Sequence, residues 1–89
     1  MKEPQLTYNV IVRSSAEKEL RKIPKPDLAR ILKRIHSLAD NPTPQGSIKL
    51  EDEECYRVRQ GDWRILYEID HASKTVSVFK VGHRREVYR

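Results

Sequence analysis

The chain has 89 residues, of which 37% are hydrophobic and 35% are charged. This length suffices for one small hydrophobic core and excludes a second one, so we expect a single domain over residues 1–89. Lysine and arginine number 18 against 13 aspartates and glutamates, and the net charge of +5 favours an anionic partner, either a nucleic acid or an acidic protein segment.

The sequence carries no signal for a membrane, a metal or a cofactor. Met1 to Gln5 lack the apolar stretch of a secretory signal, and no later run reaches the roughly 18 apolar residues that span a bilayer. We therefore expect a cytoplasmic protein without membrane contact. The only cysteine, Cys55, is expected to be a packing residue, and three scattered histidines lack metal-ligand spacing.

A strand followed by two helices is predicted for the first half of the chain. Residues 6–13 are rich in β-branched and aromatic side chains, as strands are, and Ser14-Ser15 follow at a position suited to a helix N-cap. Apolar residues at helical spacing predict a short helix that ends before Pro24 and a second helix that begins near Pro26. The second helix is expected to end before Asn41-Pro42 and to form an antiparallel hairpin with the first.

From Tyr56 onward the apolar period changes to two, which predicts three antiparallel strands. They cover residues 56–59, 63–69 and 75–81, with turns at residues 60–62 and 70–74. The element order β-α-α-β-β-β predicts an α+β fold. In it, an N-terminal strand and a helical hairpin pack on an antiparallel sheet whose other face stays partly open.

Alternate arginines on the first of these strands indicate a shared cationic surface. Because strand side chains alternate, Arg57 and Arg59 lie on one face, and the turn that follows brings Arg64 nearly opposite Arg59. Like charges side by side across strands destabilise a sheet, so a fold that accepts three of them is expected to bind an anion there. The guanidinium fork matches phosphate geometry and stays charged, which favours RNA as the partner.

The C-terminal residues add another cation and an aromatic ring. Arg84 extends the positive charge, and Tyr88 suits stacking on a base or donation to a phosphate. Imidazoles ordinarily titrate near neutral pH, which makes His83 a candidate for proton transfer. His36 and His71, in contrast, are expected to be surface residues without a catalytic role.

The order and spacing of several segments resemble toxins of the RelE/ParE superfamily, and within it the RelE branch. The matching segments span nearly the whole chain and are residues 16–22 (Ala-Glu-Lys-Glu-Leu-Arg-Lys), Lys49-Leu50, residues 55–59, residues 63–67 and residues 81–88. The resemblance implies a RelE-like microbial RNase fold and the toxin component of a type II toxin–antitoxin system. Such toxins are metal-independent endoribonucleases that cleave mRNA in the ribosomal A site and so inhibit translation. The resemblance also implies a cognate antitoxin as partner in a hetero-oligomer, and it is compatible with a monomeric free toxin.

The same resemblance implies roles for individual residues. It places Arg57 and Arg59 at the two basic positions of the catalytic strand and Arg64 at the arginine of the next strand. Arg84 matches the arginine that follows the final strand, and Tyr88 matches the C-terminal tyrosine. The implied reaction is attack of a 2′-hydroxyl on the adjacent phosphate, which leaves a 2′,3′-cyclic phosphate and a 5′-hydroxyl.

The general base of this reaction stays open. Some relatives carry lysine at the catalytic-strand positions, whereas this chain has Arg59 there, and a guanidinium group is a poor proton acceptor. Proton removal therefore falls to His83 or Tyr88, or alignment of the substrate on the ribosome supplies much of the rate.

Two other functions also fit the sequence. One is a ParE-like inhibitor of DNA gyrase with the same fold, and the other is a noncatalytic nucleic-acid-binding domain whose arginines only hold phosphates. The outer face of the second helix carries Arg30, Lys33 and Arg34, which are either solvated or in contact with RNA.

Overall fold

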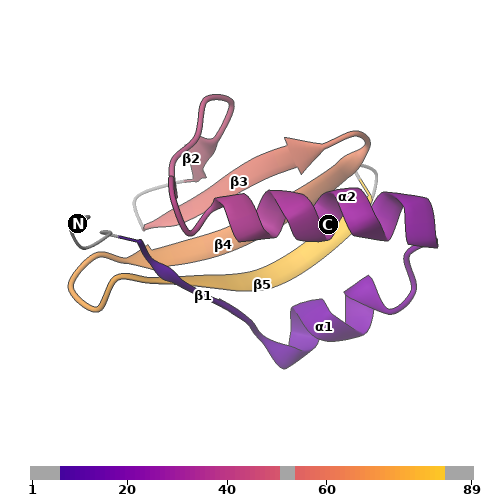
Figure 1. Cartoon of the computed structure of the whole chain (residues 1–89), viewed down its shortest axis with the longest axis horizontal. Coiled ribbons are helices and arrows are strands. Elements are labelled where there is room, and N and C mark those ends of the chain that lie inside the picture. Colours follow the sequence, from indigo (N-terminus) through magenta and orange to yellow (C-terminus); the bar gives the residue numbers. More distant parts are fainter. Residues whose placement is uncertain (1–6, 51–53, 84–89) are drawn as a thin grey trace, which may run out of the picture.

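The computed structural model describes residues 7–50 and 54–83. Its elements are β1 (Asn9–Val12), α1 (Ser14–Leu20), α2 (Lys25–Ser37), β2 (Ile48–Leu50), β3 (Cys55–Gln60), β4 (Trp63–Asp70) and β5 (Thr75–His83). The strands form one sheet in the order β1-β5-β4-β3-β2, and both helices cover the same face of it (Figure 1). This is the predicted α+β architecture. No helix in the described ranges is long and apolar enough to cross a membrane.

Two features of the sheet differ from the prediction. β1 pairs in parallel with β5, with Asn9 beside Thr75, so the sheet is mixed rather than antiparallel. The short edge strand β2 is absent from the prediction and pairs antiparallel with residues 55–57 of β3. Three residues are too few to show a period of two, so only the neighbouring strand reveals β2.

The hydrophobic core lies between the helices and the face of the sheet that they cover. Ile31, Ile35 and Leu38 recur at helical spacing along α2 and just beyond it, and each is at most 2% exposed. The sheet contributes Val58, Ile65, Tyr67, Ile69, Val76, Val78 and Val81 to the same core. Burial of one such side chain contributes about 1.5–3 kcal/mol. The core therefore determines which face of each strand points toward the helices.

Side chains of α1 hold the part of β5 that extends past β1. Ser15 Oγ donates to the carbonyl oxygen of Phe79 (2.8 Å), and the backbone N–H of Val81 donates to Glu19 Oε1 (2.8 Å). The predicted N-cap at Ser14-Ser15 is therefore wrong, because the N-cap is Arg13, which makes no side-chain capping bond. α1 instead satisfies backbone groups that a neighbouring strand would otherwise bind.

Candidate active site

Strand register brings three arginines to one face of the sheet. Arg59 lies directly beside Arg64 across the β3–β4 hairpin, as the sequence predicts, and Arg57 lies two residues earlier on β3. Val58 and Ile65, which alternate with these arginines, are fully buried in the core beneath the helices. The three guanidinium side chains therefore emerge on the face that α1 and α2 leave uncovered.

The three arginines differ in exposure. Arg59 is exposed, Arg57 is half-buried, and Arg64 is only 8% exposed. Nε and Nη1 of Arg64 are shielded from solvent and have no hydrogen-bond partner within the described ranges. A buried donor that lacks an acceptor costs about 1–3 kcal/mol, and more when it is charged. Arg64 is thus a cation held in place by packing, and an anionic oxygen would stabilise it.

The other neighbour of Arg64 is a residue without a side chain. In β5, Gly82 lies directly beside Arg64. Further along β4, the pairing with β5 shifts its register between Leu66 and Tyr67. Arg64 is therefore flanked by a second cation, Arg59, on β3 and by backbone on β5. A glycine in a strand often marks a place where a ligand approaches the backbone closely.

His83 lies on the opposite face of the sheet from the arginines. It pairs with Trp63 across β4 and β5, and the two rings meet edge to face with their centroids 5.5 Å apart. The indole N–H of Trp63 donates to Asp27 Oδ2 in α2 (3.4 Å), so this pair is on the helix side. The sheet therefore separates His83 from the guanidinium group of Arg64. A base at His83 would have to act on a substrate that passes around the end of the hairpin.

The surroundings of His83 were not foreseeable from the sequence. Asp27 accepts from both Trp63 and the guanidinium group of Arg30 (3.3 Å), and it thereby ties the first turn of α2 to the start of β4. A cavity of about 320 Å³ adjoins this contact and is lined by Asp27, Arg30, Gln60, Gly61, Asp62, Trp63 and His83. An aspartate in a first helical turn ordinarily signals only a favourable interaction with the helix dipole, so no local pattern points to Trp63.

Two of the predicted site residues, Arg84 and Tyr88, lie outside the described residues, and their roles stay predictions. Cys55 is half-buried, in line with a packing role. No group of three or more His, Cys, Asp or Glu side chains in residues 7–50 and 54–83 is placed to hold a metal ion.

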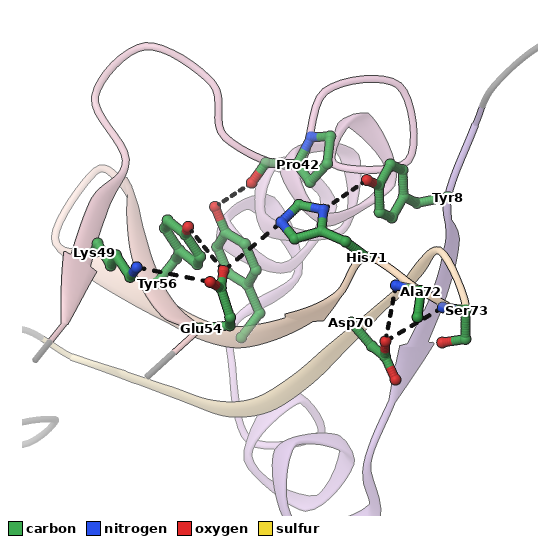
Figure 2. A network of polar contacts seen from close by, with 10 residues as sticks. Tyr8, Pro42, Lys49, Glu54, Tyr56, Asp70, His71, Ala72 and Ser73 are labelled. Atoms are coloured by element: carbon green, nitrogen blue, oxygen red, sulfur yellow. Dashed lines mark hydrogen bonds and ion pairs between the residues drawn. The ribbon is translucent and has the colours of Figure 1, made fainter. Parts of the chain in front are cut away.

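A second polar cluster lies toward the other end of β3 and β4 (Figure 2). Tyr56 and Tyr67 stack with their centroids 5.8 Å apart, Tyr56 donates to Glu54 (3.1 Å), and Tyr67 donates to the carbonyl oxygen of Pro42 (2.7 Å). Burial raises the pKa of Tyr67 to about 12. Burial, and then the hydrogen bond to Glu54, also raise the pKa of Tyr56. Both hydroxyls therefore keep their protons near neutral pH and serve as anchors rather than bases.

Glu54 extends this cluster to three further segments. Its carboxylate lies 3.7 Å from Nζ of Lys49 in β2 and 3.7 Å from Nε2 of His71 in the β4–β5 turn. Nδ1 of His71 is in turn 2.8 Å from the hydroxyl of Tyr8, which precedes β1 (Figure 2). His71 and His36 are exposed, as predicted. The cluster joins strand ends that are distant in sequence, which is a structural role.

The face of the sheet that carries Arg57, Arg59 and Arg64 is here called the arginine face. Together, the fold and the arginine face define a small basic α+β protein with a cationic surface. A family model described as the ParE toxin of the type II toxin–antitoxin system parDE matches residues 10–88. The toxin RelG of Mycobacterium tuberculosis is 30% identical over 86 residues, and the alignment covers 94% of this chain and 99% of RelG. The chain therefore belongs to the ParE toxin family of type II toxin–antitoxin systems.

Solved structures of RelE-type proteins share the fold. A chain of the archaeal RelE–RelB complex from Pyrococcus horikoshii matches with a TM-score of 0.80 at 30% identity, covering 91% of this chain and 99% of that one. A chain of the toxin–antitoxin complex RelBE2 from M. tuberculosis matches with a TM-score of 0.79 at 27% identity, covering 96% and 100%. These matches confirm the resemblance to the RelE branch of the RelE/ParE superfamily.

Proposed function

We propose that this toxin is a RelE-type endoribonuclease that cleaves mRNA in the ribosomal A site without a metal and thereby inhibits translation. The observation that carries the proposal is the pairing of Arg59 with the buried Arg64, with Arg57 on the same face. Guanidinium groups at this density suit the oxygens of a phosphodiester backbone. The relatives named toxin RelE and toxin RelG support the choice of the RelE branch.

In the proposed reaction, the 2′-oxygen of one nucleotide attacks the adjacent phosphorus and the bond from phosphorus to the 5′-oxygen breaks. The 2′-hydroxyl loses a proton and the departing 5′-oxygen gains one, so the products carry a 2′,3′-cyclic phosphate and a 5′-hydroxyl. Negative charge grows on the nonbridging oxygens in the transition state. Arg57 and Arg64 are assigned to these oxygens, and each such donor contributes about 2–4 kcal/mol. Arg59, the exposed member, binds the incoming strand.

The proton transfers are not assigned to Arg57, Arg59 or Arg64. Arginine is a poor base, and the raised pKa values of Tyr56 and Tyr67 make both hydroxyls unsuitable near neutral pH. The position of His83 on the helix side argues against it, which leaves Tyr88 or alignment on the ribosome as the stronger assignments. Arg84 is assigned to the leaving oxygen.

The test is primer extension on translated mRNA with purified toxin and ribosomes. Arg64→Ala should lower the cleavage rate by about 10²-fold or more, since it removes a transition-state donor. Arg21→Ala, which removes an exposed arginine at the C-terminal end of α1, is the control and should leave the rate unchanged. Thermal unfolding of each variant separates lost chemistry from lost fold. A change of less than about threefold for a folded Arg64→Ala protein would contradict the proposal.

The proposed partner is an antitoxin with an acidic amphipathic segment, which forms a hetero-oligomer with the toxin. Two considerations support it: the RelE–RelB complexes among the structural matches and the net charge of +5 of this chain. Coexpression with a candidate antitoxin of this kind should give a copurifying complex in which mRNA cleavage is suppressed. Toxin that purifies alone and stays active would contradict this partner.

A second candidate function follows from the matching family model, whose description names a ParE toxin. A ParE-like protein would inhibit DNA gyrase and would leave transcripts intact. Supercoiling assays with purified gyrase, run beside the primer extension, distinguish the two activities. RNA binding without scission of either nucleic acid would instead indicate a noncatalytic binding domain.

A further inference from the structure

A second set of cations lies on the helix side of the sheet. Arg30, Lys33 and Arg34, here called the α2 stripe, recur at intervals of three and four residues and therefore share one side of the helix. Together with Ser37 and with Gln60 of β3, they line a groove of about 290 Å³. All five lining residues are polar; their aliphatic stems form much of the wall, and the two arginines and the lysine bring cationic head groups to the same side of the helix.

The positive charge of the α2 stripe is only partly compensated. Among the described residues, Arg30 is paired with Asp27 at 3.3 Å. Arg34 is half-buried, and its Nε is shielded from solvent without a hydrogen-bond acceptor in residues 7–50 and 54–83. Like charges at these helical spacings repel each other. An anion in the groove would relieve this repulsion and supply acceptors.

The α2 stripe approaches the arginine face at a free edge of the sheet. β2 pairs with β3 only as far as Arg57, so within the described ranges the edge of β3 has no neighbouring strand at Arg59 and Gln60. α2 packs against β3 on the helix side (Figure 1), where Gln60 lines the groove. Arg59, the residue before it, emerges on the other face. Cations thus lie on both sides of the strand at its free edge.

We propose that RNA crosses this free edge of β3, with its phosphodiester backbone in contact with the α2 stripe on one side and with the arginine face on the other. The proposal takes RNA as the ligand from the proposed function and adds a second binding surface to it. A single strand carries one phosphate per nucleotide and bends readily, so it can follow cations around an edge. The apolar side chains of an antitoxin helix would find a better match in a separate groove, which Val12, Leu20, Leu28 and Leu32 line, because no aliphatic or aromatic residue is among those that line the groove at the α2 stripe.

The test uses a short fluorescein-labelled 2′-O-methyl RNA, which the proposed reaction cannot cleave, and fluorescence anisotropy at several salt concentrations. The variant Lys33→Gln/Arg34→Gln should bind more weakly, and its log–log salt slope should be shallower by about 1.4, which is about 0.7 for each lost phosphate contact. The matched control is Lys18→Gln/Arg21→Gln, in α1 and at its C-cap, which removes the same two residue types. It should keep the wild-type slope. Arg34→Lys, which preserves the charge, should keep it as well.

Equal slopes for the α2 variant and the α1 control would overturn the proposal, as would the absence of RNA binding by the wild-type protein. Retained RNA binding with lost binding of an acidic antitoxin peptide would assign the groove to protein and also overturn it. If the double variant does not fold, Lys33→Gln and Arg30→Gln are measured singly, each with an expected slope change of about 0.7. Because the probe is not cleaved, a slope change without mRNA cleavage would refute the proposed nuclease and leave this binding surface standing.

Discussion

The hydroxyl group of Tyr67 makes stability depend on pH in a way that can be measured. Its side chain is fully buried, and it donates to the carbonyl oxygen of Pro42 at 2.7 Å. Burial raises its pKa from 10.0 to about 12. The folded protein therefore holds this proton where the unfolded chain has released it. The stability that this proton contributes is fully present below the pKa of the unfolded chain, and it is lost as the pH rises toward the pKa of the folded protein.

Tyr67→Phe removes both the hydrogen bond and this pH dependence. At neutral pH we expect the variant to be about 1 kcal/mol less stable, because the Pro42 carbonyl loses its donor. A rise in the pKa from 10.0 to about 12 corresponds to about 2.7 kcal/mol of folding stability in total, of which about 2 kcal/mol is lost by about pH 11.5. Only the wild type loses this contribution, so the two stability curves should cross in the alkaline range.

Urea unfolding followed by circular dichroism, from about pH 8 to about pH 11.5, gives both free energies. Lysines titrate in the same range but do so in both proteins, so the difference between the two isolates Tyr67. The expected result is a variant that becomes the more stable protein by about 1 kcal/mol at the alkaline limit. Parallel curves over the whole range would refute the reasoning, since they would show that burial does not hold the proton.

Three further changes test the contacts that shape the fold. Glu19→Ala should lower the free energy of unfolding by about 2 kcal/mol, because it removes the acceptor of the Val81 N–H. Glu19→Gln keeps an acceptor oxygen and should cost less than half as much. Equal losses of the two variants in urea titrations would contradict this. Gly61 has a φ of +63°, so Gly61→Ala should lower the free energy of unfolding by about 1 kcal/mol and Gly61→Asn should lower it less. An unchanged Tm for Gly61→Ala would show that the turn adapts. Arg13→Gln should change stability by less than about 1 kcal/mol, because its 3.1 Å ion pair with Glu68 is half-exposed; a larger loss that persists in high salt would refute this view of the pair.

Local patterns were sufficient for the helices and for the three long strands. The period of α2, with Pro24 before it and Pro26 in its first turn, needs no tertiary information, and neither does the alternation in β3 and β4. The strand β2 and the parallel pairing of β1 with β5 needed the whole fold, because each depends on a partner strand far away in the chain. A short segment without a pattern of its own becomes a strand only where an edge is available.

In the candidate site too, some features follow from the local sequence and others only from the tertiary structure. By itself the sequence determined that Arg57 and Arg59 share a face and that the turn at Gly61 sets Arg64 opposite Arg59, because alternation and hairpin register are local properties. Only the tertiary structure decided that Arg64 is nearly buried and that His83 lies across the sheet from it. It also decided that, among the described strands, none pairs with the end of β3 between the two sets of cations. Burial and strand neighbours depend on which elements cover a face, and elements distant in the chain determine that coverage.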